Sequence, residues 1–173
     1  GAILLDGQPF FPLAVVAQPY LDAVSQTVHE SCSAAILDGD DIVYICRSAE
    51  KRILSISLLV GTRLPAYCTS MGKVLLAFLP AAELKHALAG VQFARRGPNT
   101  ITARGELQRE LDRVRARGLA VNNEELAYGL RSIAAPVRAQ TGEVVAAINV
   151  AVHRSPVSLD ELVEEVGPAL ERT

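Results

Sequence analysis

The chain has 173 residues, half of them hydrophobic, with a formal net charge of −2 and three cysteines. This length and composition suit one globular domain with a buried core. The slightly negative charge argues against direct binding of DNA or RNA, because nucleic-acid affinity comes largely from basic side chains that neutralise phosphates. The longest apolar runs, such as residues 74–79, are far too short to span a bilayer.

The cysteines indicate the compartment. Cys32, Cys46 and Cys68 are odd in number and widely spaced, which matches neither a disulfide framework nor the spacing of metal ligands. The N-terminal residues also lack the basic, apolar and small-residue order of a secretion signal. We therefore expect a cytoplasmic domain, with no metal site, no cofactor and no membrane contact.

The first half of the chain predicts one helix followed by three strands. Pro9 and Pro12 break an irregular or weakly helical lead-in over residues 1–13, and Pro19 fits the first turn of a helix that ends near residue 30. Two β-rich runs flank the turn sequence Asp38-Gly39-Asp40-Asp41, in which Gly39 can take a positive φ. The three expected strands cover residues 32–37, 42–47 and 53–60.

The second half predicts three helices, three strands and a last helix. Pro80 separates the first two helices, Gly118 ends the third, and Ser158 with Glu161 forms a capping box for the last. Because consecutive strands are joined by tight turns, an antiparallel sheet in an α+β domain is favoured. The expected helices cover residues 69–79, 81–88 and 103–117, and the expected strands cover residues 119–121, 132–138 and 144–152.

The segment 64–77 changes from an extended, proline-fixed stretch into an apolar helix. A helix start carries backbone N–H groups without partners and the positive end of the helix dipole, so it attracts carboxylates. We expect the amides of Ser70, Met71 and Gly72 to hold a small organic acid, since Gly72 has no side chain to block its approach. The Tyr67 hydroxyl either binds this acid or belongs to a ring that packs at the strand–helix junction with a hydrated tip.

Alternation along the last two strands separates two faces of the expected sheet. One face is bulky and aliphatic, as a helix-covered face should be, with Ile133, Ala135, Val137, Ile148, Val150 and Val152. The other is small and partly polar, with Ser132, Ala134, Ala147, Asn149 and Ala151. The Asn149 amide bonds either to neighbouring backbone or water, or to a ligand in a cavity for which the small neighbours leave room.

A polar stretch, Asn122-Asn123-Glu124-Glu125, follows the strand at 119–121. Asn122 is nearest the strand end, where its side chain can turn inward. Glu124 and Glu125 form either a solvated loop or part of the site. Arg131 either anchors this loop by pairing with one of them or binds a ligand carboxylate directly. Lys73 opposes the helix dipole, so we expect it to point to solvent or to an acidic neighbour.

Two motifs together carry a family resemblance. The segment Leu-Pro-Ala-Tyr-Cys-Thr-Ser-Met-Gly at 64–72 and the run from Asn122 through Gly129-Leu130-Arg131-Ser132 to Val137 resemble the signature regions of the IclR-type effector-binding domain. The sequence of the first segment, residues 64–72, is most similar to that of the branch that contains PcaR, PcaU and PobR, which are regulators of aromatic-acid catabolism. The resemblance covers essentially all of residues 1–173.

The resemblance implies a GAF-like domain with a curved sheet that senses a small metabolite, a dimeric or tetrameric assembly, and an upstream helix-turn-helix domain, absent from this chain, that binds DNA. It also implies a pocket lined by Ser70, Met71, Asn122, Ser132, Asn149 and Ala151. Effectors of the protocatechuate, 4-hydroxybenzoate or β-ketoadipate type are expected. An aspartate is frequent at the Asn122 position in relatives that bind very small acids, so the neutral amide here leaves the ligand undecided.

Two other functions fit the sequence less well. The domain could be an oligomerisation module with a filled core and no ligand. It could also be an acyl-transfer enzyme that uses Cys68, although an active thiolate needs an electropositive setting and a base, for which the sequence offers no motif.

Overall fold

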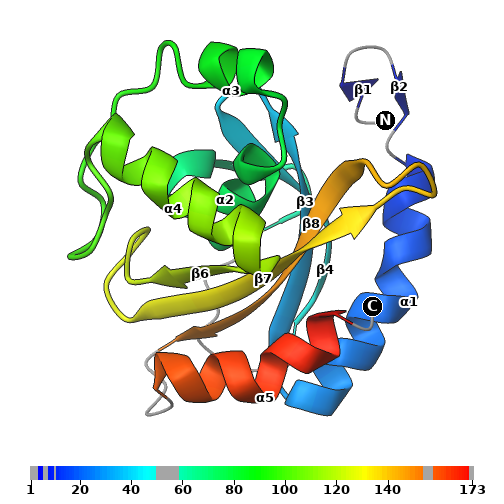
Figure 1. The fold of residues 1–173 in the computed structure, drawn as a ribbon. Helices are drawn as coiled ribbons and strands as arrows, with labels where there is room; N and C mark the ends of the chain where they lie inside the picture. The colour runs from blue at the N-terminus through cyan, green and yellow to red at the C-terminus, as the bar shows by residue number, and fades with distance from the viewer. Residues whose placement is uncertain (1–3, 6–7, 10, 50–58, 154–157, 172–173) are drawn as a thin grey trace.

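The computed structural model describes residues 4–5, 8–9, 11–49, 59–153 and 158–171 (Figure 1). The elements in chain order are β1 (Leu4–Leu5), β2 (Gln8–Pro9), α1 (Phe11–Val28), β3 (Ser31–Asp38), β4 (Asp41–Ser48), β5 (Arg63–Pro65), the 3-10 turn η1 (Ala66–Cys68), α2 (Ser70–Ala77), α3 (Ala81–Ala87), α4 (Arg104–Arg117), β6 (Ala120–Asn123), β7 (Leu130–Arg138), β8 (Val144–His153) and α5 (Leu159–Glu171).

One curled sheet organises the domain. Its six strands follow the order β5-β4-β3-β8-β7-β6, and every neighbouring pair is antiparallel. Helices α1 and α5 cover one face, and α2 and α4 lie on the other (Figure 1). The expected α+β class and six-stranded antiparallel sheet are therefore confirmed, with the two halves of the chain joined where β3 pairs with β8.

The two faces have the side chains that alternation predicts. Ile133, Ile148 and Val150 pack with Leu21 of α1 and Leu162 of α5 in one apolar cluster. The second cluster lies between the opposite face and α2 and α4. It includes Ala134 and Ala147 from the sheet, with Met71, Val74, Leu107, Leu111 and Val114 from the helices. The small sheet residues let α2 lie close to the strands.

Most expected turns and helix ends are confirmed. Gly39 has φ +66° in the β3–β4 turn, and Gly118 ends α4 with φ +77°, both in the left-handed region that glycine favours. At the start of α5 the Ser158 amide donates to Glu161 Oε2 at 2.6 Å. The Glu161 amide in turn donates to Ser158 Oγ at 3.2 Å, which completes the expected capping box.

The N-terminal region differs from the prediction. The sequence predicts an irregular or weakly helical lead-in over residues 1–13 and a helix with Pro19 in its first turn. The helix α1 instead begins at Phe11, so Pro12 lies in its first turn and Pro19 lies inside it. Pro19 and Val15 are both exposed, where water can hydrate the carbonyl that the missing proline N–H leaves without a donor. The positions of the prolines alone therefore do not predict where this helix starts.

The expected third strand, residues 53–60, falls mostly outside the described residues. Leu59 is irregular and Val60 belongs to a turn with Gly61, so neither is part of a strand. The strand that pairs with β4 on the side away from β3 is β5, which runs from Arg63 to Pro65 and leads directly into η1 and α2. It carries the chain from the sheet edge to the start of α2.

Candidate functional site

Thr69 caps the N-terminus of α2 with its side chain. Thr69 Oγ1 accepts a hydrogen bond from the Gly72 amide at 3.1 Å. A Cβ on Gly72 would lie 2.1 Å from the carbonyl oxygen of Ala66, so the missing side chain allows α2 to pack on η1. The Gly72 amide is thus engaged by the helix cap in this state, and its expected contact with a ligand stays a prediction. Ser70 and Met71 remain as the amide donors of this first turn.

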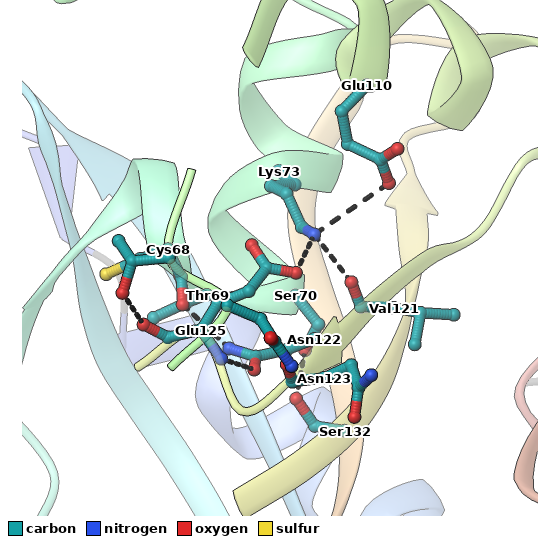
Figure 2. Close-up of polar contacts among 12 residues, drawn as sticks. Cys68, Thr69, Ser70, Lys73, Glu110, Val121, Asn122, Asn123, Glu125 and Ser132 are labelled. Atoms are coloured by element: carbon teal, nitrogen blue, oxygen red, sulfur yellow. Dashed lines mark hydrogen bonds and ion pairs between the residues drawn. The ribbon is translucent and has the colours of Figure 1, made fainter. Parts of the chain in front are cut away.

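A pair of hydroxyl groups joins α2 to the sheet. Ser70 Oγ and Ser132 Oγ lie 2.7 Å apart and share a buried hydrogen bond (Figure 2). Ser132 on β7 faces Asn122 on β6 and Ala151 on β8, so these expected site residues form one row across three strands. The structure thus brings the two sequence motifs together at the first residue of α2.

Asn149 occupies the next row of the same face. It faces Ala134 on β7 and Ser33 on β3, and only 5% of its surface is exposed. Among the described residues no hydrogen-bond partner reaches its buried Oδ1 atom. An unpaired buried amide oxygen costs about 1–3 kcal/mol. Neighbouring backbone does not satisfy this oxygen, so water and a ligand are the partners left among those that the sequence suggested for Asn149.

Asn122 has a structural role in this state. Its Nδ2 donates to the Cys68 carbonyl at 2.7 Å, and its Oδ1 accepts from the Glu125 amide at 3.0 Å (Figure 2). Both ends of the side chain are thereby engaged with η1 and the loop after β6. The prediction that Asn122 contacts a ligand stays a prediction, and such contact requires the exchange of one of these bonds.

Tyr67 and Arg131 stabilise the surrounding loops. Tyr67 is buried, its hydroxyl donates to the Ala94 carbonyl at 2.7 Å, and its ring meets the Phe93 ring edge-on with centroids 5.3 Å apart. The expected hydrated tip is wrong, since the hydroxyl is tied to backbone. Arg131 Nε donates to Asn123 Oδ1 at 3.1 Å, so it anchors the loop through Asn123.

Sequence reasoning missed a buried ion pair behind the helix start. Lys73 is 1% exposed, and its Nζ lies 2.6 Å from Glu125 Oε1 and 2.6 Å from the Val121 carbonyl (Figure 2). Glu110 Oε1 on α4 is 3.8 Å away. The expected acidic neighbour is present, but neither Lys73 nor Glu125 is solvated. Burial raises the pKa of the Glu125 carboxyl, and the Lys73 charge opposes that rise.

The same pair explains why the two motifs fit together. Lys73 belongs to the first motif, whereas Val121 and Glu125 flank Asn122 in the second. The only signal in the sequence was a lysine within an otherwise apolar helix. A partner for it had to come from another segment, and local patterns do not identify such a partner.

Replacement of Lys73 by Met is expected to destabilise the domain by about 3–5 kcal/mol, because the Glu125 carboxylate loses its buried counter-charge. Chemical denaturation followed by circular dichroism would measure the change. The double variant Lys73→Met/Glu125→Leu removes both charges and should recover much of the loss. Equal destabilisation of the single and double variants would contradict this account.

The stability should depend on pH with opposite signs at two glutamates. The folded-state pKa of Glu125 is raised above 4.5, so its contribution is present below that value and is lost as the pH rises through the raised pKa. Backbone and side-chain hydrogen bonds from Ser158 lower the pKa of Glu161, so its contribution is present above 4.5 and is lost as the pH falls.

Urea unfolding between about pH 3 and 8 would test these signs. Relative to Glu125→Gln, the wild-type chain should lose stability as the pH rises, whereas relative to Glu161→Gln it should gain stability. The same sign for both variants would refute the assignment.

The chemistry of the site points to binding. Cys68 is fully buried, and burial raises the pKa of its thiol to about 11, so it is not the thiolate nucleophile considered above. Within the described ranges no three His, Cys, Asp or Glu side chains gather as a metal site would require. None of the helices there has the length and hydropathy of a membrane span. Together the fold and the site define an α+β domain whose candidate site consists of helix-start amides, a hydroxyl pair and an unpaired buried amide oxygen.

Comparison with known proteins gives the family. Residues 11–173 match the family model described as bacterial transcriptional regulator IclR C-terminal, and the chain belongs to this family. The Pca regulon regulatory protein of Pseudomonas putida is 45% identical over 160 residues, which cover 92% of this chain and 55% of that protein. The chain thus spans about half the length of this relative.

Two solved structures share the fold and contain aromatic acids. The inducer-binding domain of the PobR transcription factor from Acinetobacter, a double mutant in complex with 3-hydroxybenzoic acid, has a TM-score of 0.85 at 30% identity, covering 92% of this chain and 93% of that one. An IclR homologue from Microbacterium hydrocarbonoxydans, in complex with 4-hydroxybenzoate, has a TM-score of 0.83 at 26% identity, covering 97% and 69%.

These findings confirm the expected family and the coarse function. The chain is the effector-binding domain of an IclR-family transcriptional regulator. The relatives are named as transcriptional regulators and not as enzymes. The individual ligand contacts expected at Ser70, Met71, Asn122, Ser132, Asn149 and Ala151 stay predictions.

Proposed function

We propose that this domain binds a small aromatic or organic carboxylic acid between the start of α2 and the small-residue face of the sheet. The observation that carries the proposal is the buried, unpaired Oδ1 of Asn149, which lies one row from the Ser70–Ser132 hydroxyl pair. The acids bound to two structural relatives give further support for this ligand class.

The proposed pose follows from the charges of the site. The carboxylate lies against the amides of Ser70 and Met71 at the positive end of α2. Ser132, Asn149 and Asn122 then bind ring hydroxyls or a second acidic group, as their hydrogen-bonding atoms permit. Ala147 and Ala151 lie on the same face of β8, and their short side chains bound the body of the ligand in this pose. Protocatechuate, 4-hydroxybenzoate and β-ketoadipate are representative candidates.

Signalling in this proposal is a population shift. The effector binds one arrangement of α2 and the sheet more tightly, and the equilibrium moves towards that arrangement. DNA is contacted by another domain of the full-length regulator, in the cytoplasm where the genes are. The Lys73–Glu125 pair transmits a displacement of α2 to the loop after β6, because it is buried and joins both.

A thermal-shift screen of this domain against hydroxybenzoates, catechol acids and short keto acids tests the proposal. An acid at 100 times its dissociation constant should stabilise the fold by about 2.7 kcal/mol, a rise of roughly 5–10 °C in Tm. Asn149→Ala and Ser70→Leu should abolish the rise. Gln140→Ala, which removes an exposed amide from the β7–β8 turn, should keep it.

If no acid in the panel raises the Tm, the domain is better explained as an oligomerisation module. If Asn149→Ala and Gln140→Ala respond to acids equally, ligands bind elsewhere on the domain.

We also propose that the domain associates with a second copy of itself through α1. Val16 and Tyr20, one turn apart, are 61% and 55% exposed, and neighbouring Val15 is 56% exposed. Such an apolar strip is typical of an interaction surface. Light scattering should show a dimer or tetramer, and Val16→Lys/Tyr20→Lys should shift it towards the monomer. An unchanged mass for this variant would exclude α1 as the interface.

A further inference from the structure

An arginine lies in the same row of the sheet as Asn149. Ser33 on β3 faces Asn149 on one side and Arg47 of β4 on the other. Directly opposed residues of neighbouring strands point to the same face of a sheet. Arg47, Ser33 and Asn149 therefore line the face that carries the proposed effector site, although neither motif contains Arg47.

A β-bulge gives Arg47 this orientation. Ala34 faces Cys46 while Ala35 faces Tyr44, so Ile45 is an extra residue on β4. Ile45 and Cys46 both belong to the apolar cluster beneath α1 and α5, and the alternation resumes with Arg47 on the opposite side. In a regular strand Arg47 would point into that cluster with Ile45.

The Arg47 charge acts on Tyr44, which lies on the sheet face beneath α2 and α4. Burial raises the pKa of the Tyr44 phenol to about 12, and the Arg47 charge opposes this rise, which indicates that the guanidinium lies near the Tyr44 ring. Tyr44 packs in the cluster beneath α2 and α4. Arg47 is half-buried, where a cation is less screened than on an open surface.

Arg47 and the start of α2 lie over different strands of the sheet, several strands apart. Asn149 and Arg47 are two strands apart, about 10 Å at the strand spacing of a sheet. Ser132, which bonds to Ser70 of α2, is one strand farther from Arg47. A ligand that runs from the start of α2, beside Ser132, across the neighbouring row of Asn149 towards β4 has helix amides at one end and a guanidinium at the other, with the amide of Asn149 between them.

We propose that Arg47 is a second anion-binding residue of the effector site and that the domain prefers ligands with an acidic group at each end. A guanidinium binds a carboxylate through two parallel N–H donors, and this geometry is lost when lysine replaces arginine. The inference rests on the proposed function, because it assigns a specificity-determining residue to that same site.

Isothermal titration with two matched probes tests the inference. Terephthalate carries a carboxylate at each end of a benzene ring, and 4-hydroxybenzoate replaces one of them with a neutral hydroxyl. The wild-type domain should bind terephthalate more tightly. Arg47→Gln should weaken terephthalate binding tenfold or more and change 4-hydroxybenzoate binding less than threefold. Arg47→Lys should restore part of the loss.

Arg109→Gln is the matched control, since it removes the same charge from an exposed position on α4. It should bind both probes as the wild type does. If Arg47→Gln and Arg109→Gln bind terephthalate equally well, Arg47 is not part of the site and the inference falls, while the proposed function stands. Equal weakening of both probes by Arg47→Gln overturns the two-ended arrangement. If the wild type binds no acid at all, the proposed function fails and the inference fails with it.

Discussion

The buried contact of Lys73 with Glu125 and the Val121 carbonyl is the constraint on which the site depends. A lysine this deeply buried is tolerated only where an anion and hydrogen-bond acceptors surround it. Those groups come from β6 and the loop after it, so α2 packs in its observed position only when that loop is formed. Ser70, three residues before Lys73, then lies within hydrogen-bond distance of Ser132 as a consequence of this seating.

In the proposed function, the two faces of the sheet separate stability from ligand recognition. The face beneath α1 and α5 is filled by branched aliphatic side chains, which pack densely and leave little room for a ligand. The face beneath α2 has alanines and serines, with Asn149 among them. Replacements on the first face act mainly on folding, whereas those on the second can alter ligand selection while the α1/α5 cluster is retained. This division suits a family whose members respond to different small molecules.

Local patterns predicted much of this structure. The β3–β4 hairpin, the apolar face of α4 and the alternation of β7 and β8 are encoded by neighbouring residues, and the structure confirms them. The start of α1 was misplaced, since proline suits both a first turn and an exposed helix interior. The burial of Lys73 and the close packing of Gly72 on Ala66 could not be predicted, because they depend on segments distant in sequence or on backbone packing. The bulge at Ile45 likewise has no signature in the sequence around it.

The bulge at Ile45 also determines how β4 would respond to the deletion of a residue. The hairpin turn fixes the register of the first part of the strand, from Asp41 to Tyr44, and the bulge alone sets the register of the part that follows. Deletion of Ile45 would remove the extra residue and leave Cys46 opposite Ala34 and Arg47 opposite Ser33, so both side chains would keep their present faces. The strand can therefore lose its bulged residue without exchanging the chemistry of the two faces, whereas a one-residue shift of a regularly paired segment would turn every side chain in it to the other face.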